Sequence, residues 1–150
     1  MSVEKRMSVR RSGRADIADI VRLMEMNGLP RWTAYEEGSF LVAGGGGRDV
    51  IGVVAFREVG AGRMLVGVPV VDPWFGESET AVALYVGAAE SAGVRGLREV
   101  VLVGRVSSDQ AREAGFQHGL RGWWLSFGEA PGGGFGRLRK ALGKATIPGL

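Results

Sequence analysis

Few side chains of this sequence are suited by type and spacing to catalysis or to metal binding. Cysteine is absent and His118 is the single histidine, which excludes thiolate chemistry and a histidine-based metal site, so no bound metal is expected. Four consecutive glycines, Gly44 to Gly47, could cradle a phosphate only if they opened a helix. They lead instead into the β-branched run VIGVVAFR at 50–57, and we therefore interpret them as a turn.

The composition is that of one ordinary folded domain. The chain has 150 residues, of which 45% are hydrophobic and 23% charged, and its 26 glycines predict many turns and close backbone approaches. No apolar run approaches the roughly 20 residues that a membrane helix needs, and the first residues lack the apolar stretch of a signal peptide. We therefore expect a cytoplasmic protein with no membrane partner.

Positive charge is concentrated at both ends of the chain. Residues 1–14 and 137–150 each carry a net charge of +4, whereas the whole chain carries +3, so the middle is acidic. Basic ends can bind polyanions through the release of counterions. Solvated tails are the commoner outcome, and we interpret residues 1–7 as a basic N-terminal tail. Nucleic acid is therefore the less favoured partner.

Hydrophobic periodicity predicts a mixed order of strands and helices. Strands are expected at 7–11, 39–43, 50–57, 63–71, 97–103 and 119–127, and helices at 16–26, 79–92, 107–115 and 135–142. The first helix is expected to stop at Asn27-Gly28. Ser78 and Gly93 are the expected N-cap and C-cap of the helix at 79–92.

One predicted strand contains residues that strands avoid. Gly67 and Pro69 lie inside 63–71, and because proline lacks the N–H that a ladder needs, we expect a bulge or an edge there. A helix connects this strand to the strand at 97–103, and such a crossover makes the two strands parallel neighbours. The sequence therefore predicts a single α/β domain, α+β in its mixture of strands, whose central antiparallel and parallel sheet is flanked by helices.

Four pieces of the sequence, in this order, resemble the GNAT superfamily of CoA-dependent N-acetyltransferases. They are RRSGRADIADIVRL at 10–23, VIGVV at 50–54, the triplet Val71-Asp72-Pro73, and Gly115-Phe116 after a short helix. The resemblance covers residues 8–127 and implies a GNAT-like domain. Residues 128–150, a glycine-rich loop and a C-terminal helix, lie outside it.

The resemblance implies a binding site for acetyl-CoA where two adjacent parallel strands part. Backbone donors of the first strand, here at Val68, Val70 and Val71, would pair with the pantetheine arm of CoA. The loop after Asp72-Pro73 would present consecutive N–H groups to the pyrophosphate at a helix N-terminus. The cofactor-binding residues implied in this loop and helix are Gly76, Glu77, Ser78, Glu79, Thr80 and Ala81.

The resemblance also implies the reaction and the side on which the acceptor binds. Trp32, Tyr35 and Glu36 would line the acceptor side, since the region after the first helix does so in similar proteins. The implied activity is transfer of the acetyl group of acetyl-CoA to a small primary amine.

The sequence departs from the family where the cofactor would be held. Aligned without gaps after Asp72-Pro73, the family's R-G-x-G-x-G/A loop falls on GESETA at 76–81, where only Ala81 matches. Glu77 and Glu79 would then lie where the pyrophosphate binds, and each would repel it by roughly 1 kcal/mol. The alternative is that these acids form the favourable first turn of a helix that holds no ligand.

Catalytic groups of the family are also missing. Pro69 removes an N–H that commonly helps to hold the acetyl carbonyl, and Ala111 stands where many members have a tyrosine four residues before Gly115. Glu58, at the end of the preceding strand, is the nearest candidate for the general base, with a surface acid at a turn as the alternative. A catalytically degenerate GNAT-fold protein that binds a ligand or a partner is therefore the alternative function.

Two aromatic pairs indicate contacts beyond the core. Trp74 and Phe75 lie where the cofactor would enter, and they could cap that entrance or make an oligomer contact. Trp123 and Trp124 must point to opposite faces of a strand, so one of them is solvent-facing or covered. The cover would be either residues 128–150 or a second copy of the chain, which makes a homodimer a hypothesis.

Overall fold

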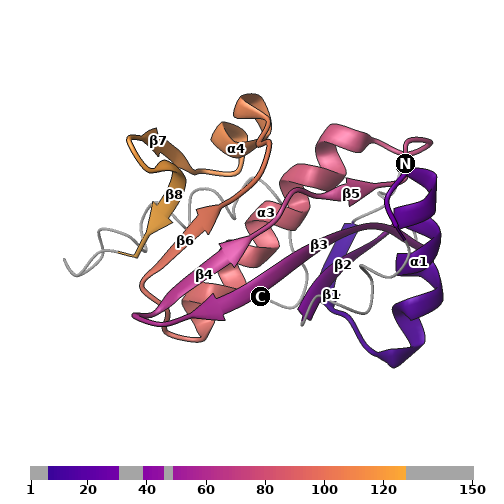
Figure 1. Ribbon diagram of the computed structural model, residues 1–150, viewed down its shortest axis with the longest axis horizontal. Coiled ribbons are helices and arrows are strands. Elements are labelled where there is room, and N and C mark those ends of the chain that lie inside the picture. Colours follow the sequence, from indigo (N-terminus) through magenta and orange to yellow (C-terminus); the bar gives the residue numbers. More distant parts are fainter. Residues whose placement is uncertain (1–6, 31–38, 46–48, 128–150) are drawn as a thin grey trace, which may run out of the picture.

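A computed structural model of the chain describes residues 7–30, 39–45 and 49–127, and Figure 1 shows them as a sheet with helices on both faces. The strands are β1 (Met7–Arg11), β2 (Ser39–Gly45), β3 (Asp49–Val59), β4 (Arg63–Val66), β5 (Val70–Val71), β6 (Glu99–Leu102), β7 (Gln117–Gly119) and β8 (Gly122–Ser126). The helices are a 3-10 turn η1 (Arg14–Asp16), α1 (Ile17–Met26), α3 (Glu77–Val94) and α4 (Ser108–Glu113).

The sheet has eight strands in the order β1-β2-β3-β4-β6-β8-β7, and β5 pairs with β3 outside this path. Among the described strands, all pairings are antiparallel except one, in which Arg63–Val66 of β4 runs parallel to Glu99–Leu102 of β6. The crossover between these two strands passes through α3. The predicted α/β class, the mixed sheet and the parallel pair are therefore confirmed.

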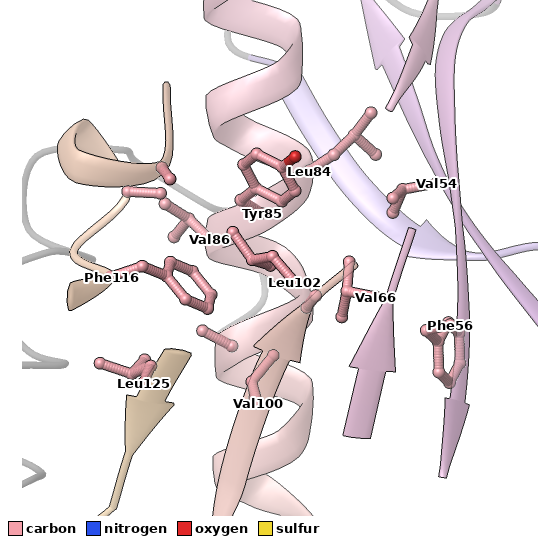
Figure 2. Close-up of a cluster of buried hydrophobic side chains, with 14 of the residues drawn as sticks. Val54, Phe56, Val66, Leu84, Tyr85, Val86, Val100, Leu102, Phe116 and Leu125 are labelled. Atoms are coloured by element: carbon pink, nitrogen blue, oxygen red, sulfur yellow. The ribbon is translucent and has the colours of Figure 1, made fainter. Parts of the chain in front are cut away.

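Alternating side chains of the sheet face two hydrophobic layers. In β2, Phe40 and Val42 pack with Leu23 of α1 on one face. Leu41 and Ala43 pack into the larger cluster around α3 on the other face. This larger cluster continues across β4, β6 and β8 to Phe116, and Figure 2 shows its side chains between α3 and the strands. The α3 face therefore carries the main core.

Helix α1 ends where the sequence predicts. The backbone N–H and the side-chain amide of Asn27 both donate to the Leu23 carbonyl, at 3.2 and 2.8 Å, and Gly28 takes a positive φ of 74°. Such a residue after the last turn is the usual end of a helix. No helix among the described residues is long and apolar enough to span a membrane.

Helix α3 is longer at both ends than the pattern indicates. Its N-cap is Gly76 rather than Ser78, because the N–H of Thr80 already donates to the Gly76 carbonyl at 2.9 Å. At the other end the helix runs through Gly93, and Gly96 takes the positive φ of 76° that ends it. The two predicted caps of this helix are therefore wrong by two to three residues.

The two neighbouring tryptophans of β8 take the opposite faces that a strand imposes. Trp123 is buried, and the ring of His118 lies 4.8 Å from it. Trp124 is only partly buried. The predicted division between a core and a solvent-facing ring is confirmed, while the homodimer hypothesis built on it stays a prediction.

An ion pair between the exposed Arg10 and the buried Asp16 joins β1 to the start of α1. Both Arg10 guanidinium nitrogens donate to the Asp16 carboxylate, at 2.8 and 2.9 Å, and the Gly13 N–H donates to it at 2.7 Å. The hydrogen bonds from Arg10 hold the pKa of Asp16 below its ordinary value. A carboxylate with a depressed pKa stabilises the fold above its ordinary pKa, and this contribution is lost as the pH falls towards the folded-state value.

We expect Asp16→Asn to lower the free energy of unfolding at pH 7 by about 1–2 kcal/mol, because the amide cannot accept two charged donors and Arg10 is itself partly exposed. Urea unfolding at a series of pH values tests this expectation. The gap between variant and wild type should narrow as the pH drops below about 4. A gap that is the same at pH 7 and pH 2.5 contradicts it.

Candidate functional site

The parallel strands β4 and β6 part at their carboxyl ends. The last hydrogen bond between them runs from the Val103 N–H to the Val66 carbonyl, at 2.9 Å. Beyond it, β5 follows β3 towards α1, whereas the chain after β6 turns towards α4 (Figure 1). We call the stretch from Val66 to Val71, together with Val103 and Gly104, the strand divergence.

A β-bulge lies inside the strand divergence. Val66 pairs with Phe56 but Val70 pairs with Val53, so this strand contains one residue more than the opposing stretch of β3. The extra residue falls at 67–69, where the sequence predicts a bulge or an edge, and that prediction is confirmed. A bulge changes the direction of backbone N–H and C=O groups that a regular β-ladder would pair by hydrogen bonds.

The bulge leaves backbone donors facing away from β3. The Gly67 N–H donates to the Ala55 carbonyl at 2.9 Å, and the Asp72 N–H donates to the Ile51 carbonyl at 2.8 Å. Because successive N–H groups alternate in direction, that of Val71 points away from β3. The Val68 N–H has no hydrogen-bond partner within the described part of the chain.

The loop between β5 and α3 is held by the side chain of Asp72. This buried carboxylate accepts the Trp74 N–H at 2.9 Å and lies 3.4 Å from an Arg22 guanidinium nitrogen of α1. The Asp72 carbonyl accepts the Phe75 N–H at 3.1 Å. The loop thereby delivers the chain to the start of α3, beside the strand divergence.

The first turn of α3 presents free amides together with negative charge. Since the first bond of the helix comes from Thr80, the N–H groups of Glu77, Ser78 and Glu79 have no partner within it. A Cβ placed on Gly76 would lie only 2.9 Å from the Glu79 Oε1 atom, so the Glu79 carboxylate folds back over the helix start. An anion at this N-terminus would meet both the amides and this carboxylate.

Exposed apolar side chains gather around the strand divergence. Met26 and Leu29 at the end of α1, Val68 in the bulge, and Val103 after β6 are all exposed, although the tip of Val68 packs on the Gly104 backbone. The loop before α3 adds Trp74, which is 84% exposed, and Phe75. The surface here is therefore apolar around a small set of backbone donors.

Glu58, the residue predicted for catalysis, lies away from the strand divergence. Glu58 is on β3, opposite Met64 of β4, and forms an ion pair with Arg95 at the C-terminal end of α3. The strand divergence lies at the N-terminal end of α3. This placement favours a structural ion pair, and a role as base stays a prediction. Trp32, Tyr35 and Glu36 lie outside the described residues.

Two buried polar groups were not singled out from the sequence. Tyr85 on α3 has no exposed surface, and its hydroxyl has no partner among the described residues. Burial raises the pKa of Tyr85 to about 12. Glu90, five residues further along, has a carboxylate oxygen with no partner in the described part of the chain, and burial raises its pKa. A tyrosine and a glutamate inside the apolar run AVALYVGAAESA are the signal that could have marked them. The described residues contain no cluster of acids and histidine suited to a metal ion.

A mixed sheet in which two parallel strands part beside a helix N-terminus is the fold of the GNAT acetyltransferases. A GNAT family acetyltransferase from Brucella melitensis in complex with acetyl-CoA superimposes with a TM-score of 0.62, at 21% identity over 83% of this chain and 90% of that chain. A GNAT family N-acetyltransferase from Escherichia coli in complex with CoA gives 0.63, at 21% identity over 79% and 72% of the two chains.

A third similar structure has a named substrate. It is the diaminobutyrate acetyltransferase of Paenibacillus lautus in complex with that diamine and CoA, with a TM-score of 0.56 and 16% identity over 76% of this chain and 80% of that chain. No protein-family model and no curated protein matches the sequence. The chain therefore has the GNAT fold, and at these identities the comparison extends to the fold alone.

Proposed function

We propose that the protein is a CoA-dependent N-acyltransferase, which transfers the acetyl group of acetyl-CoA to a small primary amine in the cytoplasm. One observation carries the proposal: within the described residues, the strand divergence leaves the Val68 N–H unpaired beside the amides that start α3. The proposal is supported by similar structures that contain CoA or acetyl-CoA.

The backbone of the strand divergence would hold the reactive arm. Val68 and Val71 would donate their N–H groups to the pantetheine arm and its thioester carbonyl, whereas the N–H of Val70 is directed towards β3. CoA, when bound, supplies an activated acyl thioester. Holding that thioester and an amine together contributes several kcal/mol without any acid or base. The Val68 N–H would also stabilise charge that develops on the carbonyl oxygen.

The start of α3 would hold the pyrophosphate less well than the strand divergence would hold the pantetheine arm. The N–H groups of Glu77, Ser78 and Glu79 suit an anion, and Thr80 fixes the turn by donating its hydroxyl to the Gly76 carbonyl at 2.7 Å. The small Ala81 follows in the next position. The backbone fits CoA, but the Glu79 carboxylate does not fit its phosphates. Trp32, Tyr35 and Glu36 are retained as the proposed acceptor side.

Isothermal titration with acetyl-CoA tests the proposal, together with release of the CoA thiol when primary amines are added. Micromolar binding and amine-dependent thiol release are the expected results. Absence of heat at millimolar acetyl-CoA overturns the proposal and favours the second candidate, a GNAT-fold binding module without catalysis. The acids of the first turn of α3 are the observation that supports this second candidate.

We expect Glu79→Gln to tighten acetyl-CoA binding about fivefold, because removal of one exposed charge near a phosphate relieves about 1 kcal/mol. Titration of the two proteins with acetyl-CoA measures the ratio. Glu113→Gln, at an exposed position at the end of α4, is the matched control and should leave the affinity unchanged. Weaker binding by the Glu79 variant would mean that the phosphates lie elsewhere.

The exposed Trp74 and Phe75 also support a homodimer as a proposal. Sedimentation of the wild type and of Trp74→Ser at equal concentration tests it. A dimer that the substitution dissociates is expected, and a wild type that sediments only as a monomer overturns the proposal.

A further inference from the structure

The hydroxyl of Tyr85 has no structural explanation within the core. The side chain has no exposed surface, and its oxygen has no hydrogen-bond partner in the described chain. Its ring packs against Phe116, with centroids 6.0 Å apart. A phenylalanine would make the same ring contacts without burying an unpaired polar group, and such groups are rare in folded proteins.

The neighbours of Tyr85 place it on the side of α3 that faces the strand divergence. Leu84, the preceding residue, reaches β3 and β5, since a Cβ on Gly52 would meet Leu84, Thr80 and Val71 together. Tyr85 instead reaches Phe116, which follows α4 beyond β6. Its position on the helix therefore lies between the two paths that the chain takes after β4 and β6.

The direction of the side chain agrees with this position. Side chains of a helix lean towards its N-terminus, which for α3 is the end beside the strand divergence. Figure 2 shows the Tyr85 oxygen on the side of its ring away from Leu102 and Val100, towards the end where the strands finish. The orphan hydroxyl therefore lies towards the end of the sheet at which the strands part, and the Val68 N–H is a second donor without a partner among the described residues.

We propose that the Tyr85 hydroxyl donates a hydrogen bond to the pantetheine arm of CoA when the arm enters the strand divergence. This inference rests on the proposed function and adds a side-chain contact from α3 to it. Burial raises the pKa of Tyr85 to about 12, so the phenol stays protonated at neutral pH. It therefore acts as a fixed donor that positions the arm, and it takes no proton from the amine.

Tyr85→Phe separates a binding role from a packing role. Titration with CoA should show about fivefold to tenfold weaker binding by the variant, the loss typical of one hydrogen bond. Binding of 3′-phospho-ADP, the part of CoA without the pantetheine arm, should be the same in both proteins. The midpoint of thermal unfolding of the free variant should be unchanged or about 2–4 °C higher, because a buried unpaired group is removed.

Each other outcome has a defined meaning. Equal CoA affinity of wild type and Tyr85→Phe overturns the inference and leaves the proposed function standing. A midpoint several degrees lower in the free variant also overturns it, because the hydroxyl would then have a partner within the protein. A wild type that binds neither CoA nor 3′-phospho-ADP overturns the proposed function, and the inference with it.

Discussion

Val68→Pro should lower the rate of acetyl transfer by about 10²–10³-fold, the loss that follows removal of one donor to a carbonyl that develops charge. Proline at this position removes the N–H that lies unpaired in the bulge and nothing else of the backbone. Because that N–H has no partner in the described chain, its loss breaks no hydrogen bond of the free protein. Release of the CoA thiol at saturating acetyl-CoA and amine measures the rate.

The fold should tolerate this substitution. Val68 has a negative φ and precedes Pro69, which already restricts it to extended backbone that proline also adopts. Val68→Ala is the matched control, because it keeps the N–H and removes only the side chain that packs on Gly104. The alanine variant should keep its rate within a few-fold. Equal activity of the proline variant and the control would place the thioester away from Val68.

Local sequence pattern predicts most of the strands but not what each of them pairs with, and the single strand predicted at 119–127 is in fact the hairpin of β7 and β8. MSVRR at 7–11 forms β1 over those five residues, and the proline within 63–71 breaks that strand as expected. Pro69 has no N–H, and the sequence alone predicts that the missing N–H is the one that would hold the acetyl carbonyl. Because the Gly67 N–H donates to Ala55 of β3, the N–H that faces away belongs to Val68, and the extra residue of the bulge makes Val71 rather than Val70 the next such donor. Strand register depends on the partner β3 and cannot be obtained from the strand itself.

Long-range contacts explain the remaining differences at the site. Glu58 is close to the predicted site in sequence, but its ion pair with Arg95 places it at the opposite end of α3. Ser78 has the side chain of an N-cap, yet Thr80 closes an earlier turn on Gly76 with both its N–H and its hydroxyl. The unpaired state of the Tyr85 hydroxyl is a property of all the elements packed around it, and periodicity carries no information about it.

Gly52→Ala should destabilise the protein by about 2–3 kcal/mol, near the upper end of what an added methyl group in a packed core costs. A Cβ there would lie 2.5 Å from the Thr80 γ-methyl and 3.2 Å from a Leu84 methyl, where β3 meets the first turns of α3. The γ-methyl cannot rotate away freely, because the Thr80 hydroxyl donates to the Gly76 carbonyl at 2.7 Å. The strain therefore falls on the helix start that would hold CoA, and acetyl-CoA affinity should fall as well.

A double-mutant cycle identifies the contact responsible. Thr80→Ser keeps the hydroxyl bond to Gly76 and removes the γ-methyl group, so Gly52→Ala should cost much less in the serine background than in the wild type. Gly44→Ala, on the neighbouring strand β2, is the control for glycine replacement itself. A Cβ there meets nothing closer than 3.6 Å, and its effect should stay within about 0.5 kcal/mol. Urea unfolding gives all these free energies. Additive effects of the Gly52 and Thr80 substitutions would show that the methyl contact is relieved elsewhere and that the start of α3 is free to shift.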